Sequence, residues 1–356
     1  MASLLDKTKS ALHWHDTPAL VLAGHQIGAI GYGLMGLTWR KSPPTQEQAF
    51  TAMKEALSTG SNFWNGGEIY GNAKRNSLHL LQEYFEKHPE DTKKVVISIK
   101  GGSVYDGVKP DGSEENTRRS IKECIEVLGK AGKKLDIWES ARVDPNTPIE
   151  ITMRAAKEFV DAGTLGVISL SECSADTIRR AAKVVKIEAV EVEFSLWATE
   201  ILENGVAEAC KELEIPIVAY SPLGRGFLTG QIKSPDDLSD DDIRKSMPRF
   251  SPENFPKNLE LVKEVQRIAE KKGVTPGQVG LSWILAKSGK GGLPTIIPIP
   301  GSTTTERVRE NVGTIELSEN DVKEIDSLLA GFEVRGDRYG GHLQSMCFGD
   351  TPPLEK

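Results

Sequence analysis

The sequence predicts an α/β protein, a (β/α)8 TIM barrel, on three observations. Short apolar runs alternate with longer helical patterns from about residue 27 to residue 330. Such alternation is typical of a parallel sheet with crossover helices. Eight strand-and-helix units can be counted, and eight units favour a closed barrel over an open doubly wound sheet. The 356 residues are therefore expected to form one domain, 1–356.

The predicted strands are short apolar segments, many of them rich in β-branched residues. In chain order they are Ile30–Leu34, Asn62–Asn65, Lys94–Gly102, Leu135–Ala141, Leu165–Glu172, Ala189–Ser195, Ile215–Pro222 and Thr295–Ser302. Helical periodicity marks the segments Thr45–Gly60, Ser113–Lys130, Ile149–Gly163, Ser174–Val185 and Asn204–Glu214. The helix predicted from Ser113 has an acidic first turn, which favours a helix start at that residue.

Three segments fall outside the repeat. Ala19–Leu22 and Gln26–Ala29 flank a Gly-His turn, and we expect them to form an N-terminal hairpin that plugs the barrel. Gly224–Asn258, after the seventh strand, is too long for an ordinary connection, and loops of this length are usually functional lids or disordered. The C-terminal tail, Gly331–Lys356, has no helical or strand period.

A glycine-rich turn after the first strand offers a competing interpretation. Gly31–Gly36 reads GYGLMG and matches the GxGxxG pattern of dinucleotide-binding open sheets. The acidic residue that this pattern requires about 20 positions later has one candidate, Glu55. Glu55 lies inside the first predicted helix rather than at the end of a second strand, so the barrel is the better prediction.

Composition and charge exclude several classes of partner. The formal net charge of -7 argues against nucleic-acid binding, which needs a basic surface. No run reaches the roughly 20 apolar residues that span a bilayer. His13, His15 and Asp16 interrupt any apolar N-terminal run, so we expect no secretory signal.

The four cysteines are far apart in the sequence. None forms a CxxC pair or a Cys/His cluster at metal-ligand spacing, so no metal site is predicted. Reduced thiols indicate the cytoplasm, with the nucleus as an alternative. These cysteines are Cys124, Cys173, Cys210 and Cys347.

Tyr70 and Lys100 are the candidate catalytic pair. Reactive groups of a barrel lie at the C-terminal ends of its strands, and both residues follow or end such strands. An ammonium beside a phenol favours the phenolate, so we expect a lowered pKa for Tyr70 and proton transfer near neutral pH. The alternative is that Lys100 extends out to solvent while Tyr70 packs in its loop.

Seven motifs together resemble one enzyme family. They are NFWNGGEIYG, ISIKGG, LDIWESARVDP, SLSECSA, VEVEFSLW, AYSPLGRGFLTG and IPIPGSTTTERVRENV. This set resembles the aldo-keto reductase superfamily from about Ile27 to Ala330, and the last two motifs are quite specific. GLMGLTWR, the pattern around Tyr70 and ARVDP make the chain most similar to the fungal pyridoxal reductases of that superfamily.

The resemblance implies reduction of an aldehyde or ketone by NADPH. Tyr70 then matches the family's general acid, and Lys100 matches the lysine that tunes it. Asn65 stands where the family usually has an aspartate. Asn65 cannot form an ion pair with Lys100, so either more of the lysine's charge acts on Tyr70 or Lys100 loses its proton.

The resemblance also implies where the cofactor lies. Ser171 and Glu191 match positions that hold the nicotinamide carboxamide, and Tyr220 matches the residue that stacks on the ring. The loop Gly224–Thr229 is expected to close over the pyrophosphate, and Ser221 and Leu223 just before it are expected to contact the cofactor. The remaining contacts follow the last strand. Ser302, Thr303, Thr304 and Arg307 are expected to hold phosphate, and Glu310 and Asn311 match adenine-contacting positions.

The expected substrate pocket contains Met35, Trp39, Ala141 and Trp197. Ala141 stands where the family usually has a histidine that orients the substrate oxygen, so it opens space beside Tyr70. Asn65 and Ala141 both read as traits of the pyridoxal reductase group. Beyond Ala141, Arg142 and Asp144 are expected to form a structural ion pair at the barrel rim.

The resulting functional prediction is reduction of pyridoxal to pyridoxine by NADPH, with Tyr70 as proton donor. One alternative is a fungal reductase of polyketide-type secondary metabolites, which the space at Ala141 would also suit. Another is a catalytically weak NADP-binding regulatory subunit, favoured by the missing aspartate and histidine. The expected partner is a small carbonyl compound, with no metal, nucleic acid or membrane, and the sequence leaves the oligomeric state open.

Overall fold

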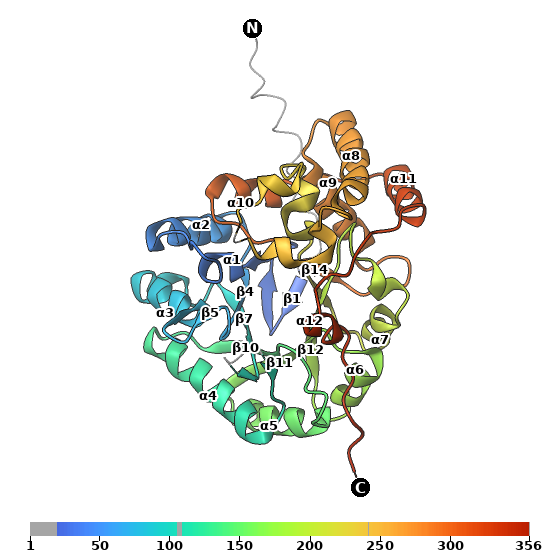
Figure 1. Cartoon of the computed structure of the whole chain (residues 1–356). Coiled ribbons are helices and arrows are strands. Elements are labelled where there is room, and N and C mark those ends of the chain that lie inside the picture. Colours follow the sequence, from blue (N-terminus) through green and yellow to red (C-terminus); the bar gives the residue numbers. More distant parts are fainter. Residues whose placement is uncertain (1–19, 105–108, 241, 356) are drawn as a thin grey trace.

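A computed structural model describes residues 20–104, 109–240 and 242–355, and it confirms the (β/α)8 barrel. Eight parallel strands form a ring surrounded by helices (Figure 1). Around the ring they are β3 (Tyr32–Gly33), β4 (Phe63–Gly67), β7 (Val96–Gly101), β10 (Leu135–Ser140), β11 (Leu165–Ser171), β12 (Ile187–Glu193), β13 (Ile217–Tyr220) and β14 (Ile296–Pro298). A parallel bridge between Gly33 and Gly301 closes the ring.

Eight helices follow the barrel strands in turn. They are α2 (Gln46–Ser58), α3 (Ser77–Lys87), α4 (Glu114–Lys130), α5 (Ile149–Asp161), α6 (Ala175–Ala182), α7 (Val206–Glu212), α9 (Pro276–Lys287) and α10 (Thr305–Val312). Helices α8 (Phe255–Lys272) and α11 (Glu319–Ala330) are additions to this pattern. Side-chain caps fix several starts: the Ser113 hydroxyl accepts from the amide of Asn116 at the start of α4.

The smaller elements lie in the connections between the barrel strands and helices, and the last of them lies in the C-terminal tail. They are α1 (Met35–Thr38), β5 (Gly71–Asn72), β6 (Arg75–Asn76), a 3-10 turn at Pro89–Asp91, β8 (Ser103–Val104), β9 (Lys109–Pro110), a 3-10 turn at Glu200–Leu202 and α12 (His342–Ser345). Helix α1 matters most for function, because it lies directly after β3 and carries Met35 to the barrel mouth.

The predicted hairpin plug is present. Strands β1 (Leu20–Leu22) and β2 (His25–Ile27) pair antiparallel at the centre of the ring, and residue 19 lies outside the described part of the chain (Figure 1). Leu22 and Ile27 join an apolar cluster inside the barrel, separate from the core between the strands and the helices. The barrel residues of this cluster are Phe63, Val96, Ile137, Ala189, Val218, Ile297 and Ile299.

The long connection after β13 is ordered by four 3-10 segments. These are Gly224–Thr229, Pro235–Asp237, Ile243–Ser246 and Pro248–Phe250, and α8 begins before the predicted loop end at residue 258. Arg249 is buried under the connection and donates from Nη1 to the backbone oxygen of Trp197 at 2.8 Å. Its own backbone oxygen accepts from Asn258 Nδ2 at 3.0 Å. Buried polar contacts of this kind hold the segment against the barrel.

The C-terminal tail is hydrogen-bonded to the residues that follow β11. The amide of Gly349 donates to the backbone oxygen of Glu172 at 2.8 Å, and the amide of Ser174 donates to the oxygen of Gly349 at 3.0 Å. Arg338, buried in the same region, donates to both carboxylate oxygens of Glu172 at 2.9 and 3.1 Å. The tail therefore contributes side chains to the same end of the barrel as the C-terminal ends of the strands.

The hairpin plug predicts a sharp contrast between two neighbouring apolar residues. Leu22 is fully buried and Val21 is 61% exposed. We expect Leu22→Ala to lower the free energy of unfolding by about 2–5 kcal/mol, since it leaves a cavity inside the barrel. Val21→Ala is the matched control and should change it by less than about 0.5 kcal/mol. Chemical denaturation measures both, and equal effects would show that the hairpin does not seal the barrel.

Candidate active site

Lys100 lies inside the barrel and points into a cluster of acidic groups. It is on β7, next to Glu139 on β10 in the strand register. Its Nζ lies 3.2 Å from Glu139 Oε1 and forms an ion pair with Glu191 of β12. Since Lys100 is almost fully buried, the alternative in which it extends out to solvent is wrong.

The two carboxylates keep Lys100 protonated. Burial lowers the pKa of its ammonium, but Glu139 and Glu191 raise it by more, so the pKa lies above its ordinary value. The alternative in which Lys100, with Asn65 in place of the family's aspartate, loses its proton is therefore wrong. Acidic partners come from two other strands of the ring.

Asn65 links these carboxylates instead of replacing them. Its Nδ2 donates to Glu191 Oε2 at 2.6 Å and to Glu139 Oε2 at 3.3 Å, while its Oδ1 accepts from Lys100 at 3.2 Å. Ser98 adds a hydroxyl donor to Glu139 Oε2 at 2.9 Å. An amide can donate and accept at once, so Asn65 joins groups of both signs.

Glu139 is the residue that the sequence analysis missed. A signal was present, because in LDIWES the residues Ile137 and Glu139 fall on the same face of one strand. Ile137 belongs to the apolar cluster inside the barrel, so Glu139 also faces inward. A carboxylate on an inward position needs a buried cation, and Lys100 on the adjacent strand is the one at hand.

One ammonium between two carboxylates leaves the cluster with an excess negative charge unless it holds a further proton. Burial raises the pKa of Glu191 to about 8, and the charge of Glu139 adds to the rise while Lys100 opposes it. Glu191 therefore holds its proton to a higher pH than an exposed glutamate does, which relieves part of the negative charge of the cluster. The sequence predicts that Glu191 contacts the nicotinamide carboxamide. In the structure its side-chain oxygens accept hydrogen bonds from Lys100 and Asn65.

Tyr70 lies beside Lys100, as expected from the strand order. Lys100 Nζ is 5.6 Å from the centroid of the Tyr70 ring, and Thr38 Oγ1 donates to the backbone oxygen of Tyr70 at 2.6 Å. Burial raises the pKa of Tyr70, and the opposing effect of Lys100 is smaller. The expected lowering of this pKa is therefore wrong, because the cation acts on a phenol that has lost much of its hydration.

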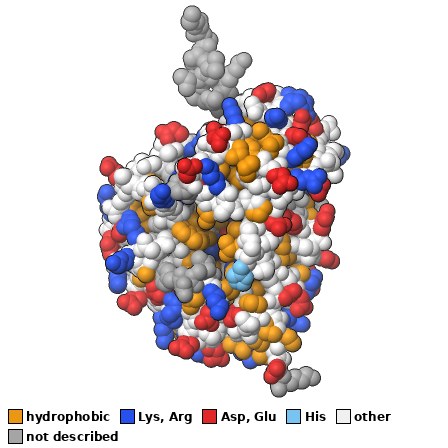
Figure 2. All heavy atoms as spheres, in the orientation of Figure 1, with side chains coloured by type: hydrophobic (Ala, Val, Ile, Leu, Met, Phe, Trp, Pro, Cys, Tyr) orange, Lys and Arg blue, Asp and Glu red, His pale blue; other side chains and the backbone are white. Residues whose placement is uncertain are grey.

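The expected pocket residues divide into two groups. Met35 and Trp39 are 41% and 38% exposed, and Trp39 stacks on Tyr70 with ring centroids 5.4 Å apart. Ala141 follows β10 and is buried at the same end of the barrel. Trp197 is only 2% exposed, and its ring stacks on that of Phe227 with centroids 4.3 Å apart. Figure 2 shows apolar side chains around a hollow near the middle of this face.

The predicted ion pair between Arg142 and Asp144 is wrong. Asp144 instead accepts from the Thr147 hydroxyl at 2.8 Å and from the amide of Gly112 at 3.1 Å. Arg142 Nη1 donates to the backbone oxygen of Ala141 at 2.5 Å and to Ser171 Oγ at 3.3 Å. The arginine therefore lies over the ends of β10 and β11, next to the position expected for the carboxamide.

Tyr220 also lies near Lys100, whose Nζ is 6.0 Å from the centroid of its ring. The Tyr220 hydroxyl donates to Glu172 Oε1 at 2.8 Å and lies 3.1 Å from the hydroxyl of Tyr339 in the tail. These contacts fix the orientation of the ring at the end of β13. The tail thus takes part in holding a residue that the sequence predicts to stack on the cofactor.

The chain turns tightly after Tyr220. Ser221, Gly224, Arg225 and Gly226 all have positive φ, between 47° and 90°, and Leu223 immediately precedes the 3-10 segment Gly224–Thr229. Glycine adopts this conformation without a steric penalty, which explains positions 224 and 226. Arg225 stacks on Tyr339 with its guanidinium 4.7 Å from the ring centroid.

A second turn follows β14 and opens helix α10. Tyr32 donates to the backbone oxygen of Ser302 at 2.5 Å, and Ser302 Oγ donates to the oxygen of Thr304 at 2.9 Å. Thr304 caps the helix by accepting from the amide of Arg307 at 3.4 Å. The guanidinium of Arg307 is paired with Glu310, and Asn311 is buried one residue further on.

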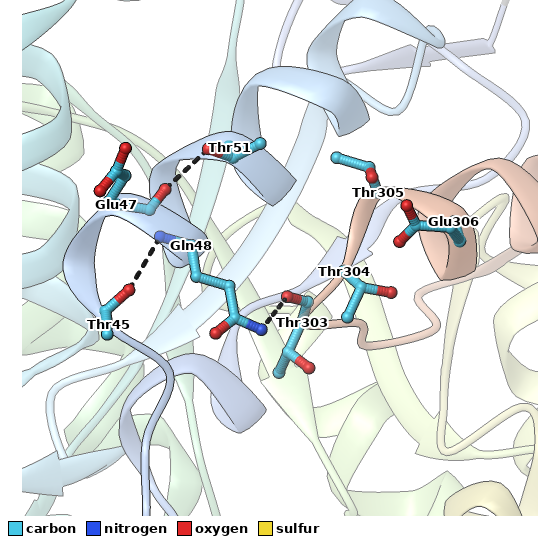
Figure 3. A pocket seen from close by; sticks show the side chains of 8 residues that line it. All are labelled: Thr45, Glu47, Gln48, Thr51, Thr303, Thr304, Thr305 and Glu306. Atoms are coloured by element: carbon cyan, nitrogen blue, oxygen red, sulfur yellow. Dashed lines mark hydrogen bonds between the residues drawn. The ribbon is translucent and has the colours of Figure 1, made fainter.

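Figure 3 shows a groove on the outer side of this turn, between the N-termini of α2 and α10. Gln48 spans it and donates to the backbone oxygen of Thr303 at 3.1 Å. Glu47 and Glu306 are also in its lining. Two carboxylates would repel a phosphate, so the groove itself is a poor anion site.

No helix in residues 20–104, 109–240 and 242–355 is long and apolar enough to cross a membrane. Three possible metal ligands meet at His88, Glu90 and Asp91, but Asp91 already pairs with Lys54 and Lys94. These side chains therefore belong to an ion-pair network in which Asp91 is buried.

Comparison with known proteins identifies the family. Residues 29–330 match the profile described as Aldo/keto reductase family, and the chain belongs to this family. It is 42% identical to a Schizosaccharomyces pombe protein named "Probable pyridoxal reductase 2", over 91% of this chain and 98% of that one. A second protein of this yeast, "Aldo-keto reductase yakc [NADP(+)]", is 38% identical over 95% and 99%.

Solved structures show the same fold at lower identity. A glycerol dehydrogenase from Gluconobacter oxydans superimposes with a TM-score of 0.75 at 19% identity, covering 88% of this chain and 95% of its own. The thermostable aldo-keto reductase Tm1743 gives a TM-score of 0.67 at 23% identity, over 88% and 100%. The barrel is thus the shared framework.

The raised pKa of Glu191 predicts how the stability of the fold depends on pH. The folded pKa of Glu191 is about 8, while an unfolded glutamate has a pKa of about 4.3. Between these values the folded state holds a proton that the unfolded state has released, so rising pH favours unfolding by at most about 1.4 kcal/mol per pH unit.

Glu191→Gln removes this dependence. Its stability relative to the unaltered protein should therefore increase from pH 5 to pH 8, measured by thermal unfolding at each pH. Glu203→Gln, at an exposed position, is the control and should follow the unaltered protein throughout. If the stability of Glu191→Gln and of the unaltered protein changed with pH in the same way, the raised pKa of Glu191 in the folded state would be contradicted.

Proposed function

We propose that the protein reduces an aldehyde to an alcohol with NADPH, and that pyridoxal is the substrate. The observation that carries the proposal is the approach of Tyr70 to Lys100 at the C-terminal end of the barrel. Family membership supports carbonyl reduction, and the 42% identical relative carries the name pyridoxal reductase.

The residues after β13 and β14 fit a dinucleotide. The first amides of α10 have no partner within their helix, and Ser302 and Arg307 flank them in the sequence. Ser221 and Gly224 turn the backbone tightly after β13, which suits close approach of a pyrophosphate. Tyr220, held by Glu172, would present its ring to the nicotinamide. When bound, the nicotinamide supplies the hydride that the carbonyl carbon accepts.

The chain's own residues manage the proton. Tyr70 keeps its phenolic proton at neutral pH, since burial raises its pKa, and it is the donor to the substrate oxygen. Lys100 remains a cation between Glu139 and Glu191 and stabilises the phenolate that forms when Tyr70 has given up its proton. Trp39 stacks on Tyr70 and shields it from water on one side.

NADPH rather than NADH is proposed on the basis of Arg307. Its guanidinium is half-buried at the start of α10, where a 2′-phosphate would meet both its charge and the helix N-terminus. Its present partner is Glu310, so phosphate binding would replace or share that ion pair. The relative whose name includes NADP(+) supports this preference.

Loss of the Tyr70 hydroxyl tests the proton donor. Tyr70→Phe should lower kcat for pyridoxal by about 10²–10⁴ and leave the Kd for NADPH unchanged, because only proton transfer is removed. Tyr84→Phe is the control: its hydroxyl donates to Asp91 in the 3-10 turn after α3, away from Tyr70, and its activity should be kept. Steady-state kinetics and NADPH fluorescence titration measure both, and full activity in Tyr70→Phe would remove this mechanism.

Helix α10 offers a matched pair of arginines for testing the cofactor. Arg307→Ala should raise the Kd for NADPH about ten- to a hundred-fold and leave the Kd for NADH unchanged, as expected for loss of a phosphate contact. Arg309 lies on the same helix but pairs with Glu55, so Arg309→Ala should alter neither value. A Kd for NADPH unaffected by Arg307→Ala would contradict the proposed phosphate site.

A further inference from the structure

Arg142 is a cation at the barrel mouth without an acidic partner of its own. It follows Ala141 at the end of β10 and is half-buried. Its hydrogen bonds go to a backbone oxygen, that of Ala141, and to the hydroxyl of Ser171. Within the described residues, no carboxylate lies at ion-pair distance from this guanidinium. Partial burial of an unpaired charge is costly, which indicates that something else is to bind there.

The nearby carboxylate of Glu172 is already committed. Its Oε1 accepts from Arg338 at 2.9 Å, Tyr220 at 2.8 Å and the amide of Glu193 at 3.1 Å. Its Oε2 accepts from Arg338 at 3.1 Å and from the amide of Phe348 at 3.3 Å. Both oxygens of Glu172 are therefore hydrogen-bonded to other groups. Its charge acts on Arg142 only through space, and no hydrogen bond or ion pair joins the two side chains.

The charge of Arg142 reaches the proposed proton donor. Burial raises the pKa of Tyr70, while Lys100 and, more weakly, Arg142 lower it. Arg142 uses only Nη1 toward the described residues, although a guanidinium has five N–H donors on three nitrogens. Nε and Nη2 thus remain as donors next to Ala141, a side chain that can give no hydrogen bond.

We propose that Arg142 binds an anionic oxygen that the substrate carries beside its carbonyl group, so that aldehydes with an adjacent phenolate are the preferred class. This inference rests on the proposed function. The guanidinium would hold the phenolate by a charge-assisted hydrogen bond and so orient the neighbouring carbonyl toward Tyr70. Pyridoxal belongs to this class, since its hydroxyl is adjacent to its aldehyde and ionises readily on the electron-poor ring.

A pair of substrates that differ at this oxygen tests the assignment. The unaltered protein should prefer pyridoxal to its 3-O-methyl ether. Arg142→Gln should lower kcat/KM for pyridoxal about ten- to a hundred-fold, mainly through KM, and hardly affect the ether, so that the preference is lost. Arg142→Lys, which keeps the charge, should restore part of it, and Arg154→Gln, an exposed arginine on α5, should behave as the unaltered protein.

Equal losses on both substrates in Arg142→Gln would overturn the inference, because they would show a structural or cofactor role. A binding measurement separates this from failure of the proposed function. With NADP+ bound, calorimetry should show that pyridoxine binds Arg142→Gln about ten- to a hundred-fold more weakly than the unaltered protein, whereas its 3-O-methyl ether binds both equally. If the unaltered protein reduced no aldehyde, the proposed function would fail, and this binding contrast would still decide the role of Arg142.

Discussion

The ion pairs of Lys100 with Glu139 and Glu191 are the interaction on which the rest of the site depends. An isolated ammonium inside a barrel would lose its proton or escape to solvent, because burial disfavours the charged form. Two carboxylates prevent both outcomes and hold the charge 5.6 Å from the ring of Tyr70. Their own mutual repulsion is relieved by the amide of Asn65 and by a retained proton, so the cluster stays compact without an aspartate at position 65.

The closed barrel is what brings these groups together. Four neighbouring strands of the ring, β4, β7, β10 and β11, are in parallel register, and β12 continues the sheet. Side chains that point inward from adjacent strands therefore meet at one level, which places Lys100 opposite Glu139. The hairpin plug fills the opposite end with apolar side chains, so polar groups are concentrated at the mouth. There the C-terminal tail adds Arg338 and Tyr339, which fix Glu172 and Tyr220.

Periodicity was enough to predict the barrel and the plug, because both follow from the order of the strands. Strand order placed Tyr70 and Lys100 at one end of the barrel, but their assignment as a pair came from the family resemblance. Periodicity was not enough to predict charge pairing. Asn65 cannot pair with Lys100, and the sequence left open whether the lysine keeps its proton. The acidic partners come from β10 and β12, and inward-facing acids are visible only when alternation is traced through the closed ring. The environment of Tyr70 and the burial of Trp197 likewise depend on loops whose folding no local pattern specifies.

The most direct test of this account removes the buried cation while keeping the charges balanced. Lys100→Met combined with Glu139→Gln deletes one charge of each sign, and single-turnover hydride transfer from NADPH to pyridoxal can be followed by absorbance. The account predicts a rate lower by about 10²–10⁴ with little change in the Kd for NADPH, since Tyr70 would lose the cation that stabilises its phenolate. A transfer rate equal to that of the unaltered protein would show that Lys100 has no part in the chemistry.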